Sequence, residues 1–346
     1  MSLSLFPSAR AFTALALASL LGGCAQGTYT DSTEPDAAKL RFISNTSNTT
    51  VDIYDEQHCK GQTTGMLNNI LMVDTKRRVD MRVPPPAKAR GLLEFKLEPG
   101  KKTMLMINTI GGASVCGKAF SFTPKAGEEY EVTFNAVQGG CSTMFQRLSR
   151  FDGKDVRIPQ PLFETGMPAC QGQSPIFGKA IPETPQRKVL IERIVESRVQ
   201  SVIATEAASP DRPQTSPQEL DALIVKRKAA MGAFSLPEDY WAQYRQNYAL
   251  SNQEAAGRQA RALGLYKDVY SLRLGGTEDA TLEQWMQPED SAIKELVKAN
   301  DTLMDKYYAD AKKSVMLDEV NHHLERMAQL DQRFGVCAHF DKCWRY

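Results

Sequence analysis

The sequence predicts an α+β fold in which an N-terminal antiparallel β-sandwich, residues 39–150, is followed by an all-α helical domain, residues 188–346. Apolar residues alternate with polar residues in short runs before residue 150 and recur at helical spacing after residue 188. Six prolines fall within residues 151–187, which we expect to form a Pro/Gly-rich connection. A chain of 346 residues has room for two such domains.

The β-sandwich is predicted from short alternating segments that are separated by turn signals. In Leu93–Glu98, apolar side chains face one way and charged side chains face the other. The turn signals include Pro99-Gly100 and Gly139-Gly140. About eight short strands in this length are typical of an antiparallel sandwich. The other alternating segments are Val51–Tyr54, Val79–Val83, Thr103–Thr109, Phe120–Phe122 and Tyr130–Phe134.

The helical domain is predicted from apolar stripes and capping signals. One stripe runs from Val189 to Ile203. Ser216, Pro217 and Glu219 supply an N-cap, a proline at the first helical position and a capping glutamate. Similar patterns predict helix starts near residues 252 and 282. Long helices over about 289–312 and 314–334 would bring the total to roughly six.

The amino terminus has the pattern of a secretory signal peptide over residues 1–23. Arg10 precedes an apolar run, Ala11–Leu21, which is too short to span a bilayer as a permanent helix. The run ends in Leu21-Gly22-Gly23-Cys24, which is a large aliphatic residue, two small residues and a cysteine. This tetrapeptide resembles the lipobox of bacterial lipoproteins.

The resemblance to bacterial lipoproteins implies a lipid anchor on Cys24. Diacylglycerol would be attached to its sulfur, the chain cleaved before it, and a further acyl chain, such as palmitate, added to the new amine. Three acyl chains far exceed the single chain that gives only marginal membrane binding. Ala25 stands where Asp usually marks retention in the inner membrane, so we expect the outer membrane, facing the periplasm. Residues 24–38 are polar and predict a flexible lipidated tether.

Six cysteines remain when the lipidated one is set aside. An even number in an oxidising compartment predicts up to three disulfides, and sequence alone leaves their pairing open. Closeness along the chain favours Cys337 with Cys343. The alternative is a metal site, for which the usual Cys-x-x-Cys pair is missing. The candidates for disulfides are Cys59, Cys116, Cys141, Cys170, Cys337 and Cys343.

The strongest pattern of metal-binding residues is Glu319, His322 and His323. On a helix these positions lie at i, i+3 and i+4, so the carboxylate can face either ring. The alternative is a set of surface histidines with a local hydrogen bond, and we predict no cofactor. No nucleophile motif is present, so the sequence indicates no catalytic residue.

Aromatic residues concentrate at Tyr240, Trp241, Tyr244 and Tyr248. The three tyrosines repeat at i+4 and form one stripe on a predicted helix, with the tryptophan beside it. Such a stripe could be an interaction surface for a partner or a glycan, since aromatics are enriched at interfaces. The alternative is packing against neighbouring helices.

Charge excludes one class of partner and leaves another open. The net charge of +1 provides no global field for nucleic acid, which we do not expect as a partner. Basic residues gather between Lys76 and Arg90 and at Lys101-Lys102. This basic cluster could contact anionic lipid headgroups, or it could form a solvated face beside turns.

Three functions fit these patterns. The first is a non-enzymatic binding or assembly module, anchored by lipid in the cell envelope, whose partner is another envelope protein or a cell-wall component. The second is a periplasmic immunity or inhibitor lipoprotein that blocks a toxic enzyme. The third is an envelope hydrolase acting on peptidoglycan, glycan or lipid, which would need a cleft between the two halves with two or more convergent ionisable groups.

Overall fold

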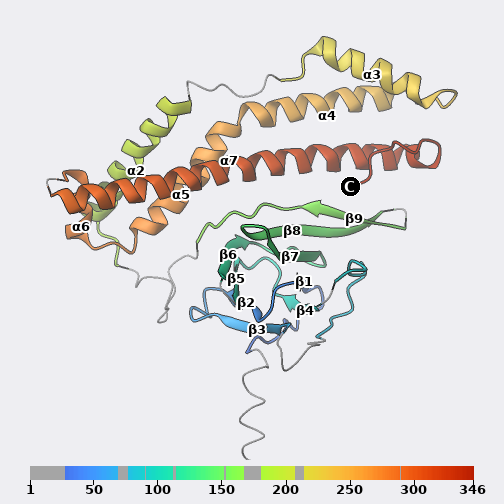
Figure 1. The fold of residues 1–346 in the computed structure, drawn as a ribbon. Helices are drawn as coiled ribbons and strands as arrows, with labels where there is room; N and C mark the ends of the chain where they lie inside the picture. The colour runs from blue at the N-terminus through green and yellow to red at the C-terminus, as the bar shows by residue number, and fades with distance from the viewer. Residues whose placement is uncertain are drawn as a thin grey trace, which may run out of the picture.

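A computed structural model describes residues 28–68, 77–89, 91–111, 114–151, 153–166, 181–206, 214–288 and 290–346. The signal peptide, Cys24 and Cys170 lie outside these ranges. Strands occupy the amino-terminal half and helices the carboxyl-terminal half, which confirms the α+β class (Figure 1).

Nine strands form two sheets in the described part of the chain. The first sheet has the order β4-β1-β7-β8-β9, and the second has the order β3-β2-β5-β6. The strands are β1 (Ala38–Ser44), β2 (Thr49–Tyr54), β3 (Gln62–Leu67), β4 (Gly91–Leu97), β5 (Thr103–Gly111), β6 (Ser114–Phe122), β7 (Glu129–Val137), β8 (Gly140–Phe151) and β9 (Lys154–Pro159).

The first sheet is mixed, which corrects the expectation of purely antiparallel strands. β1 and β7 run parallel, with Phe42 opposite Val132, whereas β4 lies antiparallel on the other side of β1. The alternation of apolar residues determines which face of a strand is buried but leaves its direction open. β9 also lies beyond residue 150, so the sheet extends into the expected connection.

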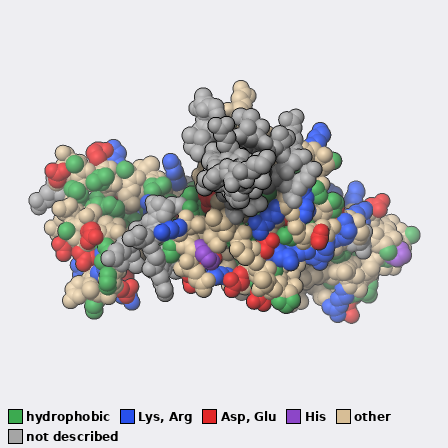
Figure 2. Space-filling model, turned by 90° about the horizontal axis from the view of Figure 1, so that it is seen from below, with side chains coloured by type: hydrophobic (Ala, Val, Ile, Leu, Met, Phe, Trp, Pro, Cys, Tyr) green, Lys and Arg blue, Asp and Glu red, His purple; other side chains and the backbone are tan. Residues whose placement is uncertain are grey.

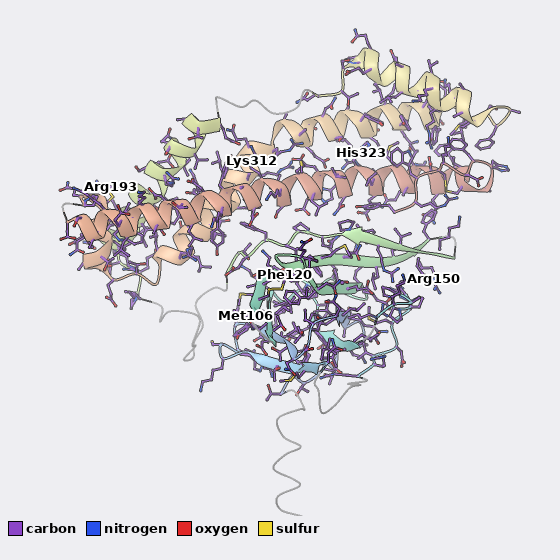
Figure 3. The ribbon with its side chains drawn as sticks, in the orientation of Figure 1. Met106, Phe120, Arg150, Arg193, Lys312 and His323 are labelled. Carbon is purple, nitrogen blue, oxygen red and sulfur yellow. A yellow bond between two sulfur atoms is a disulfide. The ribbon has the colours of Figure 1, made fainter. Side chains whose placement is uncertain are left out.

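The two sheets share one hydrophobic core. Leu40 and Phe95 come from the first sheet, Ile53 and Phe120 come from the second, and all four are fully or almost fully buried. A disulfide between Cys116 on β6 and Cys141 on β8 joins the sheets covalently. The side chain of Phe120 lies in this core (Figure 3).

Residues 77–89, which we call the strap, cover a row of buried charges on the first sheet. Arg41 lies opposite both Glu94 and Glu131 in the register, and its guanidinium pairs with them at 2.8 and 2.9 Å. The strap carbonyl of Val83 accepts a further hydrogen bond from Arg41 at 2.6 Å. The guanidinium therefore has partners on two strands and on the strap.

The strap corrects the predicted strand Val79–Val83. Its backbone N–H groups bind carboxylates instead of a neighbouring strand: Val79 donates to Glu94, and Val83 donates to Glu129. Asp80 has a φ of 55°, which a regular strand does not tolerate. The alternation thus reflects an irregular segment that packs Val79 and Val83 against the sheet and leaves Asp80 and Arg82 exposed.

Residues 28–37 correct the expectation of a flexible tether up to residue 38. Tyr29 donates its backbone N–H to Thr63 on β3, and its hydroxyl donates to the carbonyl of Lys96 on β4. Asp31 accepts a hydrogen bond from the backbone of Lys96. This segment is therefore part of the β domain, because it fills hydrogen-bonding positions at the ends of two strands.

Six helices lie in the described part of the carboxyl-terminal half. They are α2 (Pro185–Glu206), α3 (Pro217–Met231), α4 (Glu238–Ala256), α5 (Arg258–Leu274), α6 (Asp279–Met286) and α7 (Ser291–Arg333), followed by the 3-10 helix η1 (Val336–Ala338). The predicted capping box at Ser216 is present.

Two helix predictions are wrong. The expected start near residue 252 lies inside α4, because the helical period already holds from residue 240 and runs through the Ser251 pattern. The two expected long helices are one, α7, because Lys312-Lys313-Ser314 contains neither proline nor glycine to end it. At 43 residues α7 is about 64 Å long.

The helical domain lies across one side of the β domain, next to β8 and β9 (Figure 1). α4 and α5 follow one another along α7, and α2 and α6 pack at the end where α7 begins. Phe163, which follows the end of β9, packs against Val269 of α5 and Ala311 of α7. No helix among the described residues combines the length and hydropathy that crossing a bilayer requires.

Candidate functional site

A groove between α5 and α7 is the candidate functional site. Its cavity volume is about 430 Å³. α5 and α7 each contribute four residues at the spacing i, i+3, i+4 and i+7, so each set lies on one face of its helix. The lining residues are Arg261, Gly264, Leu265, Asp268, Val315, Asp318, Glu319 and His322.

Gly264 lies beside open space in the groove. A Cβ placed on this glycine would have no neighbour within 4 Å, so no close helix contact requires a glycine there. Glycine inside a helix costs about 1 kcal/mol relative to alanine. Glycine at this position therefore lowers helix stability without a packing contact that requires it.

One carboxylate in the groove is fully compensated. Glu319 is 5% exposed and accepts a hydrogen bond from Nε of Arg258 at 2.8 Å. Arg261 pairs with the other carboxylate oxygen of Glu319 and also donates to the backbone carbonyl of Glu254. These two arginines therefore neutralise the charge of Glu319.

Two other carboxylates in the groove have no such partner. Asp268 on α5 and Asp318 on α7 form no hydrogen bond or ion pair with any of the residues that the structure describes. Partial burial raises the pKa of Asp318, an effect that the neighbouring His322 and Arg261 only partly oppose. The groove thus presents one carboxylate from each helix.

The acidic side of the groove faces the β domain. Burial lowers the pKa of Lys102, which precedes β5, and the charge of Asp268 opposes that shift. The charge of Lys125, between β6 and β7, lowers the pKa of Asp318 and so opposes the effect of burial on it. Neither lysine reaches its aspartate within ion-pair distance in the described structure.

The metal candidates Glu319, His322 and His323 do not form a common ligand group, although Glu319 and His322 line the same groove. Glu319 is held by two arginines, and His322 lies 3.7 Å from the carboxylate of Glu254. His323 lies between α7 and α4, where its ring packs edge-on against Tyr248 (Figure 3). No group of three possible ligands occurs among the described residues.

The aromatic stripe is part of the helical core, which corrects its interpretation as an interaction surface. Tyr240, Trp241 and Tyr244 are at most 3% exposed, and Tyr248 is half-buried. They pack with α3, α7 and residues 334–346, which we call the carboxyl-terminal segment. The i+4 spacing predicts one helix face but does not reveal whether solvent or another helix lies against it.

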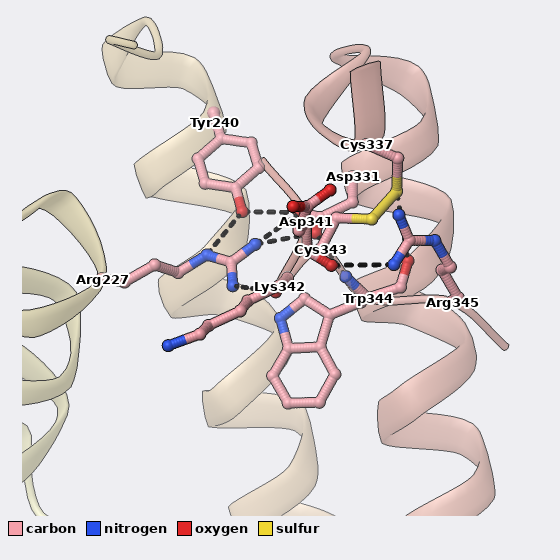
Figure 4. Close-up of a disulfide and its surroundings, with 9 residues drawn as sticks. All are labelled: Arg227, Tyr240, Asp331, Cys337, Asp341, Lys342, Cys343, Trp344 and Arg345. Atoms are coloured by element: carbon pink, nitrogen blue, oxygen red, sulfur yellow. Dashed lines mark hydrogen bonds and ion pairs between the residues drawn. A yellow bond between two sulfur atoms is a disulfide. The ribbon is translucent and has the colours of Figure 1, made fainter. Parts of the chain in front are cut away.

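The carboxyl-terminal segment closes over this core (Figure 4). Cys337 and Cys343 form the disulfide that their spacing favours. Asp331 is fully buried and accepts hydrogen bonds from Arg227, from the hydroxyl of Tyr240 and from the backbone N–H of Trp344. The buried carboxylate therefore ties three segments together, a role that no sequence pattern indicated.

The remaining cysteine candidates have mixed outcomes. Cys116 and Cys141 pair with each other, and Cys59 is also disulfide-bonded. Cys170 lies outside the described residues.

The basic cluster is partly neutralised. Within the strap, Arg77 forms an ion pair with Asp31 at 2.8 Å, and Arg82 forms one with Glu129 at 3.3 Å. Lys and Arg side chains gather on part of the face seen in Figure 2, with Asp and Glu between them. The two ion pairs favour a solvated face of mixed charge.

Comparisons with known proteins found no matching family model and no similar curated protein.

Proposed function

We propose that this chain is a lipid-anchored envelope protein, on the periplasmic face of the outer membrane, whose helical domain is a binding or assembly module. The lipobox-like Leu21-Gly22-Gly23-Cys24 supports the anchor. Disulfides at Cys116–Cys141 and Cys337–Cys343 support an oxidising compartment. The two sheets with one shared core also support a β-sandwich as the membrane-proximal domain.

One observation carries this proposal: the first described residues pack at the β3–β4 side, and the helices lie on the opposite side (Figure 1). Four residue steps separate Cys24 from Thr28, which span at most about 14 Å. A lipid on Cys24 would hold the β domain close to the membrane. The helical domain would then be presented away from it.

The link between the domains supports a fixed presentation. Asn321 on α7 donates a hydrogen bond to the carbonyl of Pro159 on β9, and Phe163 is buried among helical residues. Two separate contacts along α7 oppose rotation of one domain against the other. A module held in this way offers its groove to partners at a defined distance from the membrane.

The anchor is tested by mass spectrometry and fractionation of cells that express the full chain. We expect a mature protein that begins at Cys24, carries three acyl chains and sediments with membranes. Cys24→Ser should abolish acylation, whereas Cys337→Ser, the matched cysteine control, should leave it intact. An unmodified, uncleaved amino terminus in cytoplasmic extract would overturn the proposal.

The binding role is tested by crosslinking the anchored protein in intact cells. We expect an envelope protein or a cell-wall fragment to be recovered with it. Recovery of lipid alone would contradict a binding module. Recovery of one stoichiometric enzyme that the chain inactivates would instead establish the immunity or inhibitor function.

The groove favours the envelope hydrolase as a second candidate. It contains convergent ionisable groups, among them Asp318, whose pKa is raised, and His322 four residues later. A hydrolase would lose cell-wall or lipid cleavage in Asp318→Asn. Absence of any cleavage by the unaltered protein, across peptidoglycan and phospholipid substrates, would remove this candidate.

A further inference from the structure

We propose that the groove between α5 and α7 binds a basic side chain of a partner protein, with the cationic tip between Asp268 and Asp318. The apolar stem would lie along Leu265 and Val315. This inference rests on the proposed function as a binding module, and it names the chemistry of the group that the module recognises.

The balance of charge in the groove carries the first step. Glu319 is neutralised by Arg258 and Arg261, which are engaged with it at hydrogen-bond distance. Asp268 and Asp318, one on each wall, form no hydrogen bond or ion pair among the described residues. A cation placed between them would gain two carboxylate partners without displacing an existing ion pair.

The position of Asp318 adds to its attraction for a cation, because its carboxylate loses part of its hydration, whereas Asp268 is exposed. A partly buried charge interacts more strongly with a partner than the same charge in open water, because solvent screens it less. Lys102 and Lys125 face these carboxylates from the β domain but do not pair with them. An incoming cation could therefore approach these two carboxylates without breaking an existing ion pair among the described residues.

The shape of the groove carries the next step. A cavity of about 430 Å³ accommodates one long side chain and part of its backbone. Leu265 and Val315 offer an apolar surface to a methylene stem, and Gly264 leaves the space above it open. Lysine and arginine combine such a stem with a charged tip.

The first experiment measures binding of small probes to the detergent-solubilised full chain. Nα-acetyl-lysine methylamide is the ligand, and Nα-acetyl-norleucine methylamide, which has a similar stem without the ammonium group, is the matched control. Binding is followed by amide chemical shifts in NMR spectra. We expect shifts centred on Gly264 and Val315 with the lysine probe, weakened at high salt, and at least tenfold weaker binding of the norleucine probe.

Variants then test each part of the site. Asp268→Asn with Asp318→Asn keeps the shape and removes the charge, so affinity for the lysine probe should fall at least tenfold. Gly264→Leu should fill the groove and also abolish binding. Gly264→Ala adds only a methyl group in open space and should retain binding, with a melting temperature no lower than that of the unaltered chain.

The outcomes separate this inference from the proposed function. Equal binding of the two probes, or unchanged affinity in the double Asn variant, overturns the basic-side-chain site. If that variant keeps its crosslinks in cells, the binding module stands and only the groove is excluded. Conversely, lysine binding by a chain that is never acylated supports the groove and overturns the lipid-anchored function.

Discussion

Asn321 of α7 donates a hydrogen bond from Nδ2 to the carbonyl oxygen of Pro159 on β9, across 2.7 Å. The other end of its amide accepts a hydrogen bond from the hydroxyl of Tyr346. The side chain is 9% exposed, so one buried amide joins the long helix, the β domain and the carboxyl terminus. Three of the predictions below concern buried polar groups of this kind.

Asn321→Ala should loosen the junction between the domains. The substitution removes the hydrogen bond to the carbonyl of Pro159 and the acceptor of the Tyr346 hydroxyl, each of which contributes about 0.5–1.5 kcal/mol. Amide hydrogen exchange in β9 should become faster, and chemical denaturation should show a lower free energy of unfolding. Gln329→Ala on the exposed part of α7 is the control, and an equal effect there would contradict the prediction.

Arg41→Met should destabilise the β domain strongly. It removes the guanidinium between Glu94 and Glu131, both almost fully buried, and leaves their charges without this partner. Breaking a buried pair in this way costs about 3–5 kcal/mol. Arg150→Met is the control, because its ion pair with Asp155 is half exposed and should contribute about 1 kcal/mol or less (Figure 3). Urea denaturation compares the two variants, and similar losses would contradict the prediction.

Removal of the Cys337–Cys343 disulfide should free the carboxyl-terminal segment. The crosslink closes a short loop, so Cys337→Ala with Cys343→Ala should lower the free energy of unfolding by about 2 kcal/mol. Trp344 should become more accessible, because its backbone would no longer be held on Asp331. Fluorescence quenching by iodide measures this accessibility, and unchanged quenching would contradict the prediction.

His323 should make the helical domain less stable in acid. Burial lowers the pKa of His323 below its ordinary value, and the charge of Arg326 acts in the same direction. Between the lowered pKa and about 6.5, the unfolded chain binds more protons at this residue than the folded chain does, so stability rises with pH. This contribution is fully present above about 6.5 and is lost as pH falls through that window.

Denaturation at several pH values checks the role of His323. His323→Gln should show a smaller loss of stability between pH 7 and 5 than the unaltered chain. Gln329→Ala, at an exposed and non-titrating position of α7, should keep the original slope. A slope that is the same in all three proteins would exclude the histidine as its source.

The candidate site shows how far local patterns extend. A glycine such as Gly264 within a helix can be recognised in the sequence, because it lowers helix stability relative to alanine. Asp268 and Asp318 are separated by 50 residues, and each looks like an ordinary surface carboxylate in the sequence. Their convergence depends on how α5 lies against α7, which no local pattern specifies.

The aromatic and histidine patterns also show that spacing along a helix does not predict what lies against each face. Tyr240, Tyr244 and Tyr248 fall on one helix face as their spacing predicts, yet that face is covered by other helices. His322 and His323 are neighbours in sequence but point to different surroundings, because successive helical residues diverge by about 100°. Spacing predicts a shared face but not what packs against it.

By itself, the sequence determined the α+β class, the order of a strand-rich half before a helical half, and the capping box of α3, because each depends on residues close together in the chain. Tertiary structure decided the parallel pairing of β1 with β7, the burial of the aromatic stripe, and the placement of Asp268 and Asp318 in one groove. These features depend on contacts between distant segments, whose free energies are set by packing and burial rather than by local periodicity.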